Sequence, residues 1–313
     1  MELTHSDIKA AAERVAGRVR PIALAPDDDG QRWFALEFLQ HTGSFKARGA
    51  LNFLLTHREN GTLPDAGVTI ASGGNAGLAC AWAARSQGVR ATVFLPATAP
   101  KVKVDRLHSY GAEVTLIGTQ YADALAASRE FAAATGALLS HAYDNPLIAA
   151  GAGTLMTEIR AQLPDLDTVV VAVGGGGLFA GIATAAQHYG VRTVAVEPTR
   201  CRALNASIEA GELVDVDIDS VAADSLGARR ATELALYAAQ NYHVTSVLVD
   251  DADIVAARRA LWEDRRVAVE YGAATALAAL RGGAGPPAFR PEPGEKVCVV
   301  VCGANTDPAD LTT

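Results

Sequence analysis

The sequence has few cysteines, four in 313 residues, and no two of them form a C-x-x-C pair. Sparse, unpaired cysteines are typical of a reducing compartment, so we expect a cytoplasmic protein without a disulfide framework. The net charge of −8 leaves no excess of basic residues for a nucleic-acid surface. The seven histidines form no ligand-like cluster. Composition therefore argues against a secreted disulfide scaffold and a nucleic-acid-binding protein.

Long apolar runs are also absent. The first twenty residues are charged and alanine-rich, without the apolar core of a signal peptide. The longest uncharged run, residues 168–190, is interrupted by four consecutive glycines, so a buried strand and helix explain it better than a membrane span. We find no internal repeat and no low-complexity segment. A chain of 313 residues can bury a large core, and two lobes are expected.

What the chain does have is a lysine in an unusual setting. Residues 42–49 read Thr-Gly-Ser-Phe-Lys-Ala-Arg-Gly and follow the apolar stretch 33–39, which places Lys46 in a turn of small residues. A lysine held in an apolar pocket loses hydration of its ammonium form, so its pKa falls and the free amine becomes a nucleophile. That chemistry suits a Schiff base with an aldehyde such as pyridoxal phosphate. The alternative is a lysine that extends its stem along an apolar surface.

A first glycine loop comprises Ser72, Gly73, Gly74, Asn75, Ala76 and Gly77, between a predicted strand at 68–71 and a predicted helix at 78–87. The start of a helix presents backbone N–H groups that have no partner within the helix, and glycines let an anion approach them closely. Ser72 and Asn75 add side-chain hydrogen bonds. The loop predicts a site for a substrate carboxylate, and an ordinary strand-to-helix turn is the alternative.

A second loop consists of Gly174, Gly175, Gly176 and Gly177, between the predicted strand 168–173 and the predicted helix 178–188. Four bare glycines at a helix N-terminus indicate a phosphate site. The same residues also match the dinucleotide pattern G-x-G-x-x-[GA], and Glu197 follows at about the spacing of its acidic partner. The dinucleotide interpretation leaves Lys46 and the first loop unexplained, whereas an aldehyde cofactor with one phosphate uses all three.

Strands and helices alternate along the chain, which predicts an α/β fold with doubly wound open sheets. We expect a small lobe at residues 51–146, which carries the carboxylate loop, and a large cofactor-binding lobe at 1–50 and 147–313. Cys302 ends the predicted buried strand 296–302, at the edge where open α/β sheets bind their ligands. The cofactor is expected between the two lobes.

Five motifs occur in an order that resembles the fold-type II pyridoxal-phosphate enzymes, and among them the serine/threonine dehydratases. The resemblance covers nearly the whole chain. The motifs are GSFKARGA (43–50), SGGNAG (72–77), VGGGGL (173–178), VEP (196–198) and VCGANT (301–306). This family implies a tryptophan synthase β-like fold of two doubly wound open sheets, with the cofactor pyridoxal 5′-phosphate between the lobes, and a homodimer.

The resemblance also implies a role for each matching residue. Lys46 matches the Schiff-base lysine and catalytic base, Phe45 the residue packed on the cofactor ring, and Cys302 the partner of the pyridine nitrogen. Asn75 matches the residue bonded to the cofactor's 3-hydroxyl. The substrate-carboxylate residues are Ser72, Gly73, Asn75 and Ala76, and the phosphate-binding residues are Gly174, Gly175, Gly176 and Gly177.

The implied reaction is β-elimination of water from L-threonine or L-serine, which yields a 2-oxo acid and ammonia. Two departures from the family pattern stand out. Relatives with a divalent metal have a second carboxylate near Glu197, but here the matching positions are Cys201 and Ala203, so Glu197 is a weak metal candidate. Tyr271 replaces proline or serine after Glu270, which affects the expected substrate pocket.

Three other functions stay open. A β-replacing synthase of the same fold is one, although the Ala-Arg-Gly-Ala end of the lysine motif resembles dehydratases more. An amino-acid racemase is another, but racemases of this family have a serine where this chain has Gly73. The third is a dinucleotide-binding protein without enzymatic activity.

Overall fold

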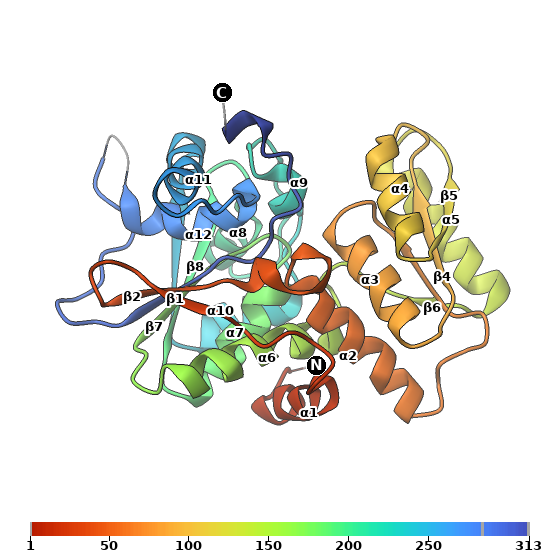
Figure 1. Ribbon diagram of the computed structural model, residues 1–313, viewed down its shortest axis with the longest axis horizontal. Helices are drawn as coiled ribbons and strands as arrows, with labels where there is room; N and C mark the ends of the chain where they lie inside the picture. Colours follow the sequence, from red (N-terminus) through yellow and green to blue (C-terminus); the bar gives the residue numbers. More distant parts are fainter. Residues whose placement is uncertain (1, 283–284, 312–313) are drawn as a thin grey trace.

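The strands of the protein form two sheets in the computed structural model, which describes residues 2–282 and 285–311 (Figure 1). The larger sheet has six strands in the order β1-β2-β10-β7-β8-β9, and only the β1–β2 pair is antiparallel. Its strands are β1 (Leu24–Pro26), β2 (Arg32–Ala35), β7 (Thr168–Ala172), β8 (Arg192–Pro198), β9 (Val244–Val249) and β10 (Val297–Val300).

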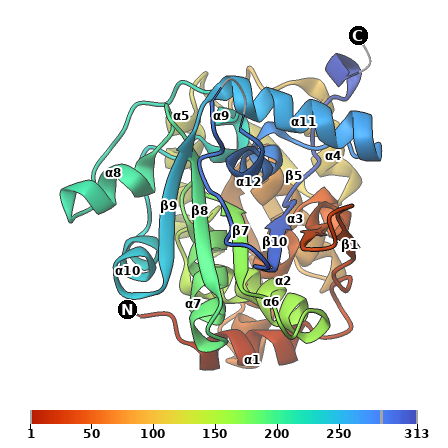
Figure 2. The same ribbon diagram turned by 90° about the vertical axis from the view of Figure 1, so that its left-hand side faces the viewer.

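Helices lie on both sides of the larger sheet, which explains why β7 and β10 are buried along their whole length. Figure 1 shows α11 and α12 on one side of this sheet and α6, α7 and α10 on the other. Figure 2 shows β9, β8, β7 and β10 side by side. The helices of this part are α1 (His5–Val15), α6 (Pro146–Gln162), α7 (Gly177–His188), α8 (Ala203–Ala210), α9 (Ala223–Leu226), α10 (Glu233–Asn241), α11 (Asp251–Arg265) and α12 (Tyr271–Arg281).

The smaller sheet has four parallel strands in the order β5-β4-β3-β6. Its two faces contribute to different apolar clusters, because side chains alternate along a strand. Ile70 packs with residues of α3, whereas the next residue, Ala71, packs with α5. The elements of this part are β3 (Val68–Ala71), α3 (Asn75–Ser86), β4 (Ala91–Leu95), α4 (Lys101–Ser109), β5 (Glu113–Leu116), α5 (Tyr121–Thr135) and β6 (Leu138–Leu139).

The predicted fold class is confirmed: the chain is an α/β protein with two sheets of mostly parallel strands. The strands predicted at 68–71, 168–173 and 296–302 agree with β3, β7 and β10 to within two residues at each end. One helix start differs, because α3 begins at Asn75 and not at residue 78, which places Asn75 and Ala76 in the first turn of the helix. The predicted lobe boundaries fall inside α2 (Lys46–Glu59) and at the start of α6.

A buried arginine holds α2 against both neighbouring segments. The Arg48 side chain is fully buried, and its Nε donates to Glu37 Oε1 at 2.6 Å. Its Nη1 donates to Glu158 Oε1 at 2.6 Å and to Thr154 Oγ1 at 3.2 Å. Glu37 belongs to the short helix η1 (Glu37–Leu39), and the other two acceptors lie on α6. One guanidinium therefore joins three segments that are distant in sequence.

We expect Arg48→Leu to lower the free energy of unfolding by about 3–5 kcal/mol, because it leaves the buried Glu37 carboxylate without its partner. Urea denaturation followed by circular dichroism measures this change. Lys101→Ala is the matched control, since it removes an ion pair whose side chains are 85% and 56% exposed, and it should leave stability nearly unchanged. Equal stability of the Arg48→Leu and Lys101→Ala proteins would contradict the expectation.

Candidate active site

Lys46 is the first residue of α2, and the turn before it is attached to the end of β10. The Phe45 amide donates to the Cys302 carbonyl oxygen at 3.0 Å, and the Ala304 amide donates to the carbonyl oxygen of Gly43 at 2.9 Å. Thr42 has a φ of 63°, a left-handed conformation that is uncommon for a β-branched residue. These contacts bring the lysine motif and the VCGANT motif together, although more than 250 residues separate them.

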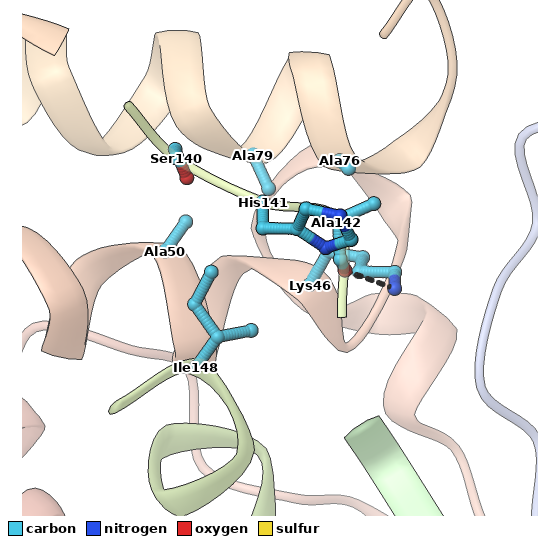
Figure 3. A pocket seen from close by; sticks show the side chains of 8 residues that line it. All are labelled: Lys46, Ala50, Ala76, Ala79, Ser140, His141, Ala142 and Ile148. Carbon is cyan, nitrogen blue, oxygen red and sulfur yellow. Dashed lines mark hydrogen bonds between the residues drawn. The ribbon is translucent and has the colours of Figure 1, made fainter. Parts of the chain in front are cut away.

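The Lys46 amine lies in an apolar setting, as its sequence context predicted. Its Nζ donates to the carbonyl oxygen of Ala142 at 2.7 Å and lies 4.7 Å from the centroid of the Phe45 ring. Burial lowers the pKa of Lys46 to about 8, against the opposing influence of Cys302 and Glu270. Figure 3 shows the contact with Ala142 and the small pocket beside the lysine. The pocket is lined by Lys46, Ala50, Ala76, Ala79, Ser140, His141, Ala142 and Ile148.

The four-glycine loop lies between β7 and α7, at the carboxyl end of a buried strand. Gly176 caps α7 with a φ of 96°, and no side chain caps this helix. Residues 175–178 are buried, and their backbone N–H groups meet no acceptor among the described residues. A Cβ at Gly175 would lie 2.3 Å from the Tyr143 ring, so only glycine allows that ring to cover the loop. The loop is a buried set of unpaired donors, which suits an anion.

The Ser72 loop forms the N-terminus of α3. Among the described residues, the only hydrogen bond from the backbone of this loop to a side chain runs from the Gly74 amide to Ser72 Oγ at 3.4 Å, and no side chain caps the helix. A Cβ at Gly77 would lie 1.8 Å from the carbonyl oxygen of Ser72, so glycine is required for this tight turn. Within the described residues the N–H groups of Asn75 and Ala76 have no acceptor. This arrangement also suits an anion.

The Asn75 side chain points to the carboxylate of Glu270, which lies at the start of α12. Asn75 Nδ2 donates to Glu270 Oε1 at 2.9 Å and to Oε2 at 3.0 Å. Asn305 donates from its Nδ2 to Asn75 Oδ1 at 2.5 Å and from its backbone to Glu270 Oε1 at 2.7 Å. Three segments, 72–77, 270 and 303–305, therefore meet at one hydrogen-bonded cluster.

Cys302 lies two residues beyond the end of β10 and is buried. Burial raises the pKa of its thiol to about 12, and the Glu270 carboxylate acts in the same direction, while Lys46 opposes them. The thiol is therefore neutral at physiological pH. A neutral thiol is a weak donor and a weak acceptor.

Glu197, the weak metal candidate, caps a helix in the structure. Its two carboxylate oxygens accept from the backbone N–H groups of Leu204 at 2.8 Å and Asn205 at 2.7 Å, at the start of α8. Both oxygens are therefore occupied by a helix terminus. Among the described residues no group of three or more His, Cys, Asp or Glu side chains is placed to hold a metal ion.

The sequence interpretation missed four residues around the lysine: Ala142, Tyr143, Glu270 and Asn305. Asn305 lies inside the VCGANT motif, and Glu270 had been noted only for the residue after it. Tyr271 itself donates from its hydroxyl to Asp310 Oδ2 at 2.9 Å and stacks with Arg258. The signal for Ala142 and Tyr143 was their place after β6, since the carboxyl ends of parallel strands collect ligands.

The fold and the site define a class of cofactor-dependent enzyme, and comparison with known proteins identifies it. The family described as pyridoxal-phosphate dependent enzyme matches residues 19–303. The chain belongs to this family, and the predicted cofactor is thereby confirmed.

The relatives include amino-acid ammonia-lyases. The chain is 36% identical to an L-threonine ammonia-lyase of Geobacter sulfurreducens, over 89% of this chain and 71% of the relative. It is 37% identical to a human serine dehydratase-like protein, over 86% of this chain and 83% of the relative. Among solved structures, maize serine racemase has a TM-score of 0.89 and 28% identity, and the match covers 99% of this chain and 95% of the racemase. These relatives bear out the predicted serine/threonine dehydratase family.

The residues present fit pyridoxal phosphate on structural grounds. The cofactor needs an amine for its aldehyde and N–H donors for its phosphate. Lys46 offers a buried amine with a lowered pKa, and the loop 174–177 offers buried donors without acceptors. No helix within the described residues is long and apolar enough to cross a membrane.

The pKa of Lys46, about 8, predicts how the protein takes up an aldehyde. At pH 7 about a tenth of the amine is unprotonated, against roughly 0.03% for an ordinary lysine. We expect the rate at which cofactor-free protein gains its visible absorption band to rise with pH, with a midpoint near pH 8. Stopped-flow absorbance from pH 6 to 10 measures it, and Lys46→Arg protein is the control. A midpoint above pH 10 would show that the amine is not desolvated.

Proposed function

We propose that this protein is an ammonia-lyase that acts on L-threonine or L-serine. The reaction removes water from the 3-hydroxy amino acid, and the product then takes up water to give a 2-oxo acid and ammonia. Threonine yields 2-oxobutanoate, and serine yields pyruvate. The relatives named L-threonine ammonia-lyase and serine dehydratase-like support this proposal over most of the chain.

The residues that hold the cofactor are proposed from their positions. Lys46 binds the aldehyde carbon, Phe45 packs on the ring, and Asn75 bonds the 3-hydroxyl. Cys302 faces the pyridine nitrogen, and its burial beside Lys46 supports this placement. The phosphate is held by the backbone N–H groups of Gly174, Gly175, Gly176 and Gly177. The cofactor supplies an electron sink that makes the Cα proton of the amino acid acidic.

The substrate carboxylate is proposed to bind at the N-terminus of α3. Ser72, Gly73, Asn75 and Ala76 surround the unpaired N–H groups there, and the helix dipole adds a favourable field for a negative group. Lys46 and Ala76 of this loop line the same small pocket, so the substrate is proposed to be held at its carboxylate while its Cα faces the lysine.

Lys46 is proposed to be the base that removes the Cα proton. A base must be unprotonated when it removes the proton, and the lowered pKa of about 8 supports this role for the free amine. The Ala142 carbonyl oxygen, 2.7 Å from Nζ, accepts a hydrogen bond from the lysine and orients it.

The single observation that favours elimination over racemisation is the residue at position 73. Racemisation needs a proton donor on the substrate face opposite Lys46, and glycine has none. A Cβ at Gly73 would lie 2.8 Å from Leu95 Cδ2, so this position is also crowded against a side chain that lies behind the loop. Racemase activity is the second candidate, since maize serine racemase has the same fold at a TM-score of 0.89.

Further expectations accompany this function. The division into a large lobe (1–50 and 147–313) and a small lobe (51–146) is supported by the two separate sheets. A cytoplasmic location is supported by four free, buried cysteines. The homodimer is proposed from the family resemblance.

Lys46→Ala should abolish the visible band that borohydride bleaches and lower turnover of L-threonine and L-serine at least about a thousandfold, because both the anchor and the base are removed. Absorbance spectra and 2-oxo acid release measure the two effects. Lys101→Ala, which changes an exposed lysine, is the control. A Lys46→Ala protein that still eliminates water would assign the anchor to another lysine.

The wild-type enzyme should deaminate L-serine or L-threonine without producing the D-isomer, because Gly73 offers no proton to the opposite face. Chiral chromatography of the residual substrate, sampled during turnover, measures this. Formation of D-serine at a rate close to that of 2-oxo acid would favour the racemase instead.

A further inference from the structure

The carboxylate of Glu270 is the point where three segments of the site meet. It is 7% exposed and accepts hydrogen bonds from the side chain of Asn75 and from the backbone of Asn305. Its own backbone N–H donates to the Gly303 carbonyl oxygen at 3.1 Å. A Cβ at Gly303 would lie 2.9 Å from Glu270 Oε1, so the carboxylate lies directly against the segment that follows Cys302.

Both ends of the Asn75 amide are held by this cluster. Its Nδ2 donates to Glu270, and its Oδ1 accepts from Asn305 Nδ2 at 2.5 Å. The two partners determine the orientation of the amide, with its nitrogen toward Glu270 and its oxygen toward Asn305. An amide nitrogen carries two N–H bonds. Glu270 accepts and does not donate when ionised, so it selects the nitrogen end of Asn75. One N–H of the Asn75 amide is then left for another partner.

We propose that Glu270 is a positioning residue that orients the Asn75 amide so that its remaining N–H meets the 3-oxygen of pyridoxal phosphate. This inference rests on the proposed role of Asn75. Glu270 belongs to the part of the chain that contains the larger sheet, and Asn75 to the part that contains the smaller sheet. The hydrogen bond between them therefore also holds these two parts together. Asn305 completes the arrangement, since it also donates from Nδ2 to the Thr42 carbonyl oxygen at 2.7 Å.

A carboxylate is required because two donors converge on it. Glu270 Oε1 accepts from both Asn75 Nδ2 and the Asn305 backbone N–H, and Oε2 accepts from Asn75 Nδ2 as well. Glutamine has the same shape, but one of its terminal atoms is a donor. In Glu270→Gln, the new NH₂ group therefore faces at least one of these N–H donors, and that hydrogen bond is lost. The alternative is that the Asn75 amide rotates by 180°, which exchanges its oxygen and nitrogen. Hydrogen bonds to a charged acceptor are also stronger than those to a neutral one.

The test is a double-mutant cycle read in cofactor affinity. Full-length protein freed of cofactor is titrated with pyridoxal 5′-phosphate, and Kd and the position of the visible band are measured for wild type, Glu270→Gln, Asn75→Ala and the double variant. Glu270→Gln should raise Kd about tenfold and shift the band, as expected for loss of one charge-assisted hydrogen bond. The double variant should lie within about twofold of the weaker single variant, because Glu270 acts through Asn75.

Glu295→Gln is the matched control. The Glu295 side chain is 7% exposed and paired with Arg192, at the opposite end of the larger sheet. Thermal unfolding is measured for every variant, and Glu295→Gln should lose stability with no change in Kd. An unchanged Kd in Glu270→Gln, a roughly hundredfold rise in the double variant, or an equal rise in Glu295→Gln would each overturn the proposal.

If Glu270→Gln does not fold, the same cycle with Asn305→Ala and Asn75→Ala replaces it. Asn305→Ala releases the other end of the Asn75 amide, and non-additive Kd values support the same arrangement. Additive values overturn it. Because the readout is cofactor affinity, the outcome does not depend on whether the enzyme eliminates water from threonine or serine, so failure of the proposed function is recognised separately by activity.

Discussion

The position of Lys46 depends on the buried guanidinium of Arg48, two residues further along α2. That group pairs with Glu37 and Glu158 at 2.6 Å each, and so holds the segment before the lysine turn, the helix that begins with Lys46, and α6 in one arrangement. A buried ion pair contributes little net stability, but losing one partner is costly, so the cluster restricts how these three segments pack. The lysine motif therefore contains both Lys46 and the charged residue, Arg48, that holds it in position.

Loss of solvent changes the pKa values of two side chains in the site. The amine of Lys46 and the thiol of Cys302 both lose solvent, so the pKa of the amine falls to about 8 and that of the thiol rises to about 12. At neutral pH the thiol is uncharged, and a fraction of the amine is unprotonated. The two glycine loops add N–H donors that have no acceptor among the described residues, buried at 175–178 and half-buried at Asn75, the first residue of α3. Unpaired N–H donors at two helix N-termini suit a ligand that brings its own negative charge.

Most of the fold could be predicted, because the strands of a parallel sheet are continuous apolar runs and turns between strand and helix are marked by glycine. The start of α3 was predicted three residues too late, since Ser72-Gly-Gly-Asn-Ala has no apolar periodicity. Glu197, only a weak metal candidate in the sequence, caps α8 through hydrogen bonds from two backbone N–H groups.

The sequence by itself determined the class of chemistry, because the lysine turn, the two glycine loops and Cys302 each have local features that depend only on neighbouring residues. Only the tertiary structure decided that Asn75, Glu270 and Asn305 form one hydrogen-bonded cluster, and that Ala142 and Tyr143 cover the lysine and the glycine loop. Asn75 and Glu270 are 195 residues apart, and hydrogen bonds between such distant groups arise from the packing of two sheets, which leaves no periodic or local signal in the chain.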